Sequence, residues 1–182
     1  MKKRGPFEVV SSKQVYKNQW IEVVEDKVIR PDGKDGIFGI VTMVPGISIL
    51  PIDKEGNVHL VKVYRYGIDK EIIETPNGAI DQGEEALTAA KRELREETGL
   101  VSEKWTPLGM VNPFTTVVVS PAFLFLAENV VEIEKPKDQE VSEVMIIPFS
   151  DVVQWALESK ITHAQSVALI LRANEYLKSH KR

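Results

Sequence analysis

The chain has 182 residues, of which 43% are hydrophobic and 27% are charged, and its formal net charge is −4. These values are typical of a globular protein with one domain, or one domain and a small appendage. The mild acidity argues against nucleic-acid binding, and the sequence shows no membrane span and no signal peptide. The absence of cysteine excludes disulfides and thiolate chemistry, and it suits the cytoplasmic location that we expect.

The first 44 residues predict an N-terminal antiparallel strand extension. Polar and apolar residues alternate, and Val and Ile are frequent, at 8–16, 20–30 and 37–44. The run PDGKDG at 31–36 is typical of a hairpin turn between the second and third of these strands. We therefore treat 1–44 as a separate structural part of the chain.

Beyond residue 44 the pattern alternates between strands and helices. Apolar segments bounded by turn residues predict strands at 46–52, 58–65, 71–74, 105–111, 122–129 and 141–147. Two helices are expected at 151–160 and 162–179, and the polar loop 132–140 is expected to be mobile. This order of strands and helices predicts the α+β class, with helices packed on a mixed central sheet.

Another helix is predicted in the middle of the chain. It should begin near Glu84, with acidic residues in its first turn, and bury the apolar stripe formed by Leu87, Ala90 and Leu94. Gly99 is suited to a left-handed C-cap at its end.

The stretch 78–100, GAIDQGEEALTAAKRELREETGL, concentrates the acidity of the chain. It carries six acids and three bases, whereas the other residues carry 21 acids and 20 bases. Glu93, Glu96 and Glu97 follow one another at helical spacings, which places their carboxylates on one arc about 100° wide. Repulsion between such neighbours disfavours an isolated helix, so the pattern favours a divalent-cation site over a solvated helix face.

The same stretch matches the spacing pattern Gly-x5-Glu-x7-Arg-Glu-apolar-x-Glu-Glu-x-Gly-apolar at every fixed position. The matching residues are Gly78, Glu84, Arg92, Glu93, Leu94, Glu96, Glu97, Gly99 and Leu100. This resembles the Nudix box of the Nudix hydrolases, which cleave nucleoside diphosphates linked to another moiety. The resemblance implies a Nudix fold, an α/β/α sandwich, with 45–182 as the hydrolase domain and 1–44 as a dimerisation region.

The resemblance also implies roles for residues of the box. Glu93, Glu96 and Glu97, with the backbone carbonyl of Asn77, would hold Mg²⁺, for which Mn²⁺ could substitute. Arg92 and Glu84 would hold the loop and the helix together.

A general base is not defined by the box itself. In the ADP-ribose pyrophosphatase branch this role often falls to a glutamate on a loop after the box, and Glu140 is the better match here. Glu143 and a helix glutamate such as Glu93 are the alternatives.

Substrate recognition depends on residues outside the box. The segments 63–67 and 74–78 resemble the ADP-ribose and NDP-sugar branch, so Arg65 is a candidate phosphate ligand, with an ordinary surface arginine as the alternative. Pro113 lies near a marker proline of that branch. The residues after Pro113 depart from the expected Pro-Gly-x-Ser-x-Glu, which widens the expected substrates to NDP-sugars such as GDP-mannose. Trp20 is a candidate platform for the base, with a core position as the alternative.

We predict Mg²⁺-dependent hydrolysis of the pyrophosphate bond of a nucleoside diphosphate sugar, by a homodimer whose N-terminal extension reaches the partner subunit. One alternative function is that of a sanitising pyrophosphohydrolase, which hydrolyses nucleoside triphosphates. Another is a non-catalytic nucleotide-sugar sensor, which the intact box and the lack of a helix-turn-helix disfavour. No nucleic-acid or membrane partner is expected.

Overall fold

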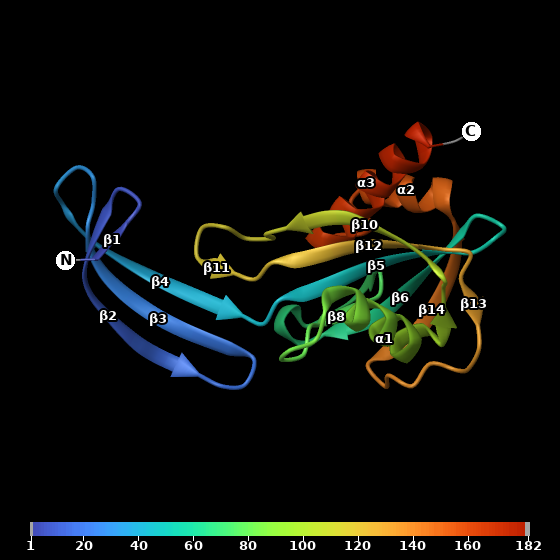
Figure 1. The fold of residues 1–182 in the computed structure, drawn as a ribbon, viewed down its shortest axis with the longest axis horizontal. Coiled ribbons are helices and arrows are strands. Elements are labelled where there is room, and N and C mark those ends of the chain that lie inside the picture. The colour runs from blue at the N-terminus through green and yellow to red at the C-terminus, as the bar shows by residue number, and fades with distance from the viewer. Residues whose placement is uncertain (1, 181–182) are drawn as a thin grey trace. The chain divides into compact units, whose positions relative to one another are not determined.

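The computed structural model describes residues 2–180, which divide into two compact units (Figure 1). The N-terminal unit contains the residues up to Val44 together with Asn112–Pro121. The second unit, called the hydrolase unit below, contains Pro45–Val111 and the residues from Ala122 onward. The predicted division at residue 44 placed Asn112–Pro121 in the hydrolase domain, whereas in the structure this segment belongs to the N-terminal unit.

The N-terminal unit is one five-stranded sheet. Its strands, in spatial order, are β1 (Lys2–Arg4), β2 (Phe7–Lys17), β3 (Ile21–Ile29), β4 (Asp35–Met43) and β11 (Val118–Val119). The first four are antiparallel; the three predicted strands correspond to β2, β3 and β4, and β1 was not predicted. Strand β11 pairs in parallel with β4 through Val118 opposite Val41. The edge strand of this unit therefore comes from a distant part of the sequence.

A seven-stranded mixed sheet forms the centre of the hydrolase unit. Its main path is β10 (Lys104–Val111), β12 (Ala122–Glu128), β5 (Gly46–Ile52), β6 (Asn57–Arg65) and β14 (Val141–Pro148). Two short strands extend it, because β7 (Lys70–Glu74) pairs with β6 and β8 (Asn77–Ala79) pairs with β5. The strands β12 and β5 are parallel and the other pairs antiparallel, which makes the sheet mixed. A separate pair joins β9 (Leu100–Val101) to β13 (Val131–Glu132), and η1 (Tyr66–Ile68) follows β6.

Helices cover both faces of this sheet (Figure 1). The helices are α1 (Ala86–Thr98), α2 (Phe149–Leu157) and α3 (Ala164–Ser179). Alternate residues of β5 point to opposite faces, so Ile47 and Ile49 pack in the core with α1, whereas Leu50 packs in the core with α2 and α3. The predicted α+β class and α/β/α sandwich are confirmed. None of the helices between residues 2 and 180 has the length and apolar character needed to cross a membrane.

Helix α1 differs from the prediction at its N-terminal end. It begins at Ala86, and its first turn contains no acidic residue, because Glu84 and Glu85 precede it. Leu87 is 39% exposed and not part of the buried stripe, which consists instead of Ala89, Ala90 and Leu94, with Glu97 and Thr98 further along. Gly99 adopts φ = 72° and its N–H donates to Arg95 O, which confirms the left-handed C-cap.

Candidate active site

Strand β8 and the third turn of α1 lie in contact at Gly78. A Cβ atom at this position would lie 2.1 Å from Cδ of Glu93 and 2.2 Å from its Oε1. A side chain on residue 78 would therefore displace the Glu93 carboxylate. The glycine of the box is required here by the close approach of a functional side chain.

Arg92 connects the loop to the acidic face of the helix. Its Nε and Nη2 donate to the two carboxylate oxygens of Glu84 at 3.1 and 3.0 Å, and Nη2 also donates to Ala79 O. Its Nη1 donates to Glu93 at 2.7 Å and to Glu96 at 3.1 Å. The hydrogen bond from Arg92 holds the pKa of Glu84 below its usual value. The predicted role of Arg92 and Glu84 in holding loop and helix together is confirmed.

Glu97 is a buried carboxylate that faces strand β8. Only 5% of the residue is exposed, and its Oε2 accepts a 3.1 Å hydrogen bond from the main-chain N–H of Asn77. Burial raises the pKa of Glu97 to about 9, and the negative charges of Glu93 and Asp138 act in the same direction. Burial also raises the pKa of Glu93, against the effect of Arg92.

Asp138 belongs to this acidic cluster, although the sequence analysis did not select it as a site residue. Its main-chain N–H and that of Lys137 both donate to the carbonyl of Glu96, at 3.0 and 2.8 Å, so the loop is attached to α1. The Asp138 side chain accepts a 2.8 Å hydrogen bond from the N–H of Glu140. An acidic residue in a polar loop gives no local signal that it will lie beside a helix some 40 positions earlier.

The carboxylates suit a hard divalent cation chemically. No three acidic or histidine side chains in the described part of the chain, residues 2–180, converge as a preformed metal site, and Arg92 bonds both Glu93 and Glu96. However, burial raises the pKa of Glu93 and of Glu97, and repulsion from neighbouring carboxylates acts in the same direction on both, so several carboxylates lie near one another. Oxygen ligands with excess negative charge are those that Mg²⁺ and Mn²⁺ prefer. The residues present therefore fit a divalent cation.

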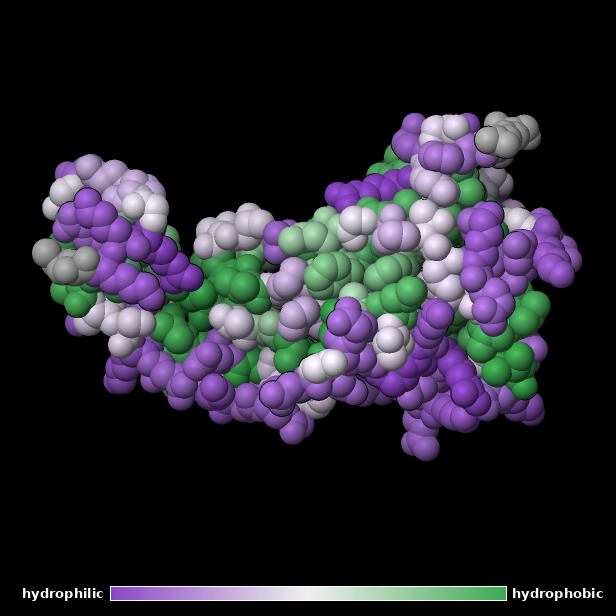
Figure 2. Space-filling view, in the orientation of Figure 1, coloured by the Kyte–Doolittle hydropathy of each residue, from purple (hydrophilic) through white to green (hydrophobic). Residues whose placement is uncertain are grey.

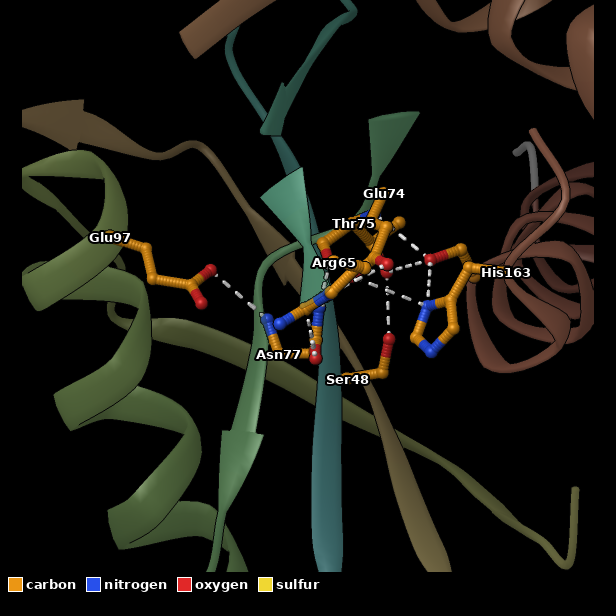
Figure 3. Close-up of polar contacts among 8 residues, drawn as sticks. Ser48, Arg65, Glu74, Thr75, Asn77, Glu97 and His163 are labelled. Carbon is orange, nitrogen blue, oxygen red and sulfur yellow. Dashed lines mark hydrogen bonds and ion pairs between the residues drawn. The ribbon is translucent and has the colours of Figure 1, made fainter. Parts of the chain in front are cut away.

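Arg65 lies at the end of β6 and is held by two neighbouring side chains (Figure 3). It forms a two-point ion pair with the buried Glu74, at 3.0 and 2.5 Å, and Nη2 also donates to Asn77 Oδ1 at 3.1 Å. Burial tends to raise the pKa of Glu74, but Arg65 and the other neighbours outweigh it, so the carboxylate ionises readily. Hydrogen bonding to Glu74 raises the pKa of Arg65 against the effect of burial, and the charges of Glu74, Glu97 and Glu140 act in the same direction as the hydrogen bonding.

The predicted site residues fall into two groups. The hydrolase unit contains the proposed metal ligands, Arg65 and both candidate loop bases. Glu140 precedes β14 and acts electrostatically on Arg65, whereas Glu143 lies within β14 opposite Lys62. Trp20 and Pro113 belong to the N-terminal unit, where both are exposed and Trp20 retains 54% of its accessible surface.

The N-terminal unit also contains a cavity of about 330 Å³. Phe7 and Phe38 line it and pack edge to face, with ring centroids 5.2 Å apart. Asp26, another lining residue, is buried; its Oδ2 pairs with Arg4 at 3.2 Å, and its Oδ1 has no hydrogen-bond partner among residues 2–180. Trp20 does not line this cavity.

Comparisons with known proteins agree with this arrangement. A model of the NUDIX domain matches residues 42–170, and one of the nucleoside diphosphate sugar hydrolase N-terminal domain matches residues 7–41. The chain is 28% identical to an ADP-ribose pyrophosphatase of Bacillus subtilis (strain 168), over 94% of this chain and 96% of the relative. It is 29% identical to an ADP-sugar pyrophosphatase of Mus musculus, over 82% and 77%. A crystal structure described as an ADP compounds hydrolase superposes with a TM-score of 0.83 at 20% identity, over 97% and 96% of the two chains.

The chain belongs to the Nudix family. Its first strands match the N-terminal domain of the nucleoside diphosphate sugar hydrolases, so the predicted Nudix hydrolase of the NDP-sugar branch is confirmed. Enzymes of this family generally depend on a divalent metal ion.

Proposed function

We propose that this Nudix enzyme hydrolyses the pyrophosphate bond of ADP-ribose or a closely related nucleoside diphosphate sugar. The products would be a nucleoside monophosphate and a sugar phosphate. The printed names of two relatives, an ADP-ribose pyrophosphatase and an ADP-sugar pyrophosphatase, support this substrate class. The N-terminal match to nucleoside diphosphate sugar hydrolases supports it independently of the box.

The observation that carries the proposal is the contact between the Gly78 loop and the acidic face of α1. Glu93 lies against Gly78, and Glu97 accepts the N–H of Asn77, so both carboxylates have fixed orientations. In the proposed site Glu93, Glu96 and Glu97, with the carbonyl of Asn77, would hold Mg²⁺, for which Mn²⁺ could substitute. When bound, the cation supplies neutralisation of the pyrophosphate charge and activation of water.

Proton transfer in the proposed mechanism is assigned to Glu140. Water attacks one phosphorus of the bridge, a new P–O bond forms, and the bridging P–O bond breaks toward the other phosphate. Glu140 accepts the proton of the attacking water. The charge of Glu140 acts on Arg65, which begins the segment that leads to Asn77. Glu143 lies within β14 opposite Lys62, so Glu140 is favoured as the base. Glu93 is the alternative on the helix.

Arg65 and Pro113 are the residues proposed to contact the phosphate and the sugar. Arg65, whose side chain is about a third exposed, would contact a phosphate with the edge that Glu74 leaves free. Pro113 would contact the sugar end of the substrate.

Two places in the N-terminal unit are candidates for the base. Trp20 offers an exposed aromatic face at the β2–β3 turn. The alternative is the Phe7–Phe38 cavity, because the free oxygen of Asp26 could accept a hydrogen bond from an exocyclic amine. The KM for ADP-ribose distinguishes the two places. If the base binds at Trp20, Trp20→Ala should raise KM; if it binds in the cavity, Asp26→Asn should raise KM.

We also propose a cytoplasmic homodimer formed through the N-terminal unit. Many of the exposed large apolar side chains belong to this unit: Val10, Val15, Tyr16, Trp20, Ile37, Met43, Phe114 and Val119. Figure 2 shows hydrophobic residues reaching the surface over its strands. Exposed apolar side chains gathered in one unit are a feature of subunit interfaces. Light scattering should give twice the mass of one chain, and a monomer at micromolar concentration would contradict the proposal.

A substrate panel tests the function directly. Initial rates are measured with nucleoside diphosphate sugars, dinucleoside polyphosphates and nucleoside triphosphates, with Mg²⁺ and with EDTA. We expect Mg²⁺-dependent release of a nucleoside monophosphate from ADP-ribose. Pyrophosphate release from triphosphates, with no turnover of sugar nucleotides, would support the triphosphate hydrolase instead. Tight binding of ADP-ribose without turnover would support a sensor.

A further inference from the structure

Helix α3 reaches the segment that carries Asn77 through a chain of buried hydroxyl groups (Figure 3). Ser166, which is fully buried, accepts the main-chain N–H of Thr75 at 3.0 Å, and its Oγ lies 2.9 Å from Thr75 Oγ1. Thr75 Oγ1 in turn lies 2.7 Å from Ser48 Oγ on β5. The chain therefore anchors Thr75 to one helix and one central strand.

His163 lies at the end of this chain. Its Nδ1 is 2.9 Å from Ser166 Oγ and 3.7 Å from Glu74 Oε2, and only the first distance is that of a hydrogen bond. Burial lowers the pKa of His163, as does Arg65, although Glu74 opposes them, so the imidazole is neutral at pH 7. A neutral ring with its proton on Nε2 offers Nδ1 as an acceptor.

The tautomer of His163 fixes the direction of the whole chain. The Ser166 hydroxyl has one hydrogen, and it already accepts the N–H of Thr75. With His163 Nδ1 as an acceptor, Ser166 donates to the imidazole and can accept from Thr75, which can accept from Ser48. Without the imidazole the same hydroxyls can point either way. His163 therefore selects one arrangement of a fully buried network.

The network continues across the sheet to the acidic helix. Asn77 Nδ2 donates to Thr75 O at 3.0 Å and to Glu74 Oε2 at 2.7 Å, and the Asn77 main-chain N–H donates to Glu97. A polar path thus connects His163, next to α3, with Glu97 on α1, although the two helices cover opposite faces of the sheet. Buried networks of this kind limit the positions that their members can take.

We propose that His163 is a positioning residue for the metal site. Through its hydrogen bond with Ser166 it fixes Thr75, and through Thr75 it fixes the place of Asn77 opposite Glu97. The inference rests on the proposed metal-binding roles of Asn77 and Glu97. His163 therefore affects metal affinity and turnover although it contacts neither the metal nor the substrate.

The test compares His163→Ala with His163→Asn, whose side-chain oxygen can accept from Ser166 in place of Nδ1. Mn²⁺ binding is measured by electron paramagnetic resonance of the free ion, beside kcat, KM for ADP-ribose and the thermal midpoint. We expect His163→Ala to weaken Mn²⁺ binding and lower kcat about tenfold, the size typical of groups that orient metal ligands. KM should change less than twofold, and His163→Asn should restore most of both losses.

The matched control is His180→Ala, which removes the same side chain beyond the other end of α3. His180 stacks on Tyr176 and is exposed, so Mn²⁺ binding and kcat should not change. A double-mutant cycle adds Ser166→Ala. If His163 acts through Ser166, His163→Ala has little further effect on Mn²⁺ binding in that background.

Two results would overturn the inference. The first is unchanged Mn²⁺ affinity in His163→Ala. The second is an equal loss in His163→Asn and His163→Ala, in proportion to a fall in the thermal midpoint, which indicates a role in stability alone. Failure of the proposed function is separately visible, because Glu97→Gln would then bind Mn²⁺ as tightly as the wild type.

Discussion

The main-chain N–H of Asn77 donates a 3.1 Å hydrogen bond to Oε2 of Glu97, and this bond connects strand β8 directly to helix α1. Asn77 therefore has two roles. Its N–H orients Glu97, the most buried carboxylate of the box, and its carbonyl is a proposed metal ligand. Loop and helix are connected a second time by Arg92, which bonds Glu84 on one side and Glu93 and Glu96 on the other. The site therefore keeps its geometry through two independent connections.

Glu97→Gln should abolish most of the activity without unfolding the protein. Loss of a charged ligand is expected to lower kcat by roughly three orders of magnitude, equivalent to about 4 kcal/mol in activation free energy. The control is Glu85→Gln, which makes the same change at an exposed residue preceding α1. Steady-state kinetics with ADP-ribose and circular dichroism provide the measurements. Near-normal turnover in Glu97→Gln would refute the metal assignment.

In EDTA, the folded protein should lose stability as the pH rises from 5 toward 9. The pKa of Glu97 is about 9 in the folded protein and near 4.5 in an unfolded chain. Between these values the folded state retains a proton that the unfolded state releases, so the stabilisation present below pH 4.5 is lost progressively as the pH rises.

Thermal unfolding across this pH range checks the prediction. Glu97→Gln should show a smaller decline and should be more stable than the wild type at pH 8. Parallel pH profiles for the two proteins would contradict the buried, protonated Glu97. Added Mg²⁺ should stabilise the wild type most at high pH, because a carboxylate must lose its proton to bind metal.

Gly78→Ala should impair catalysis because the added methyl group would displace the side chain of Glu93. The new methyl group would lie about 2 Å from the Glu93 carboxylate, so Glu93 must move. A displacement of about 1 Å in a catalytic group can cost about 100-fold in rate. The control is Gly67→Ala, because Gly67 has open space around it and no positive φ. Equal kcat values for the two variants would show that the position of Glu93 is unimportant.

Glu140→Gln and Glu143→Gln distinguish the two loop candidates for the base. Loss of a general base typically lowers kcat by a factor of about 10² to 10⁴. We expect this loss for Glu140→Gln, and a change of less than about twofold for Glu143→Gln, an exposed strand residue opposite Lys62. Full activity in both variants would assign the proton transfer to a helix glutamate such as Glu93.

The parts of the site that sequence predicted are those determined locally. The spacing of Glu93, Glu96 and Glu97 along one helix, and Gly99 as its C-cap, follow from helix geometry alone. The exposure of Leu87 could not be predicted this way, because it lies on the same side of the helix as the buried Leu94 and differs from it in being in the first turn. Burial there depends on what covers the helix end, and periodicity carries no information about that.

The hydrogen-bond network formed by Ser48, Thr75 and Ser166 could not be predicted from the sequence. Ser166 bonds Thr75 from 91 positions away, and Ser48 bonds it from 27, so no local pattern connects them. Glu74 was seen only as part of a motif, and its pairing with Arg65 depends on β6 and β7 lying side by side. Serine, threonine and histidine are common surface residues, and only the fold shows that these are buried together.

The parallel pairing of β4 with β11 determines when the N-terminal sheet can be completed during synthesis. Four of its strands are consecutive in the sequence and pair as local hairpins, but the fifth is translated only after α1 and β10. Until Val119 has emerged, the edge of β4 has no neighbour and can pair with other chains. A fragment that ends at Val44 would carry this open edge permanently, so expression of the N-terminal sheet alone requires residues 112–121 to be supplied with it.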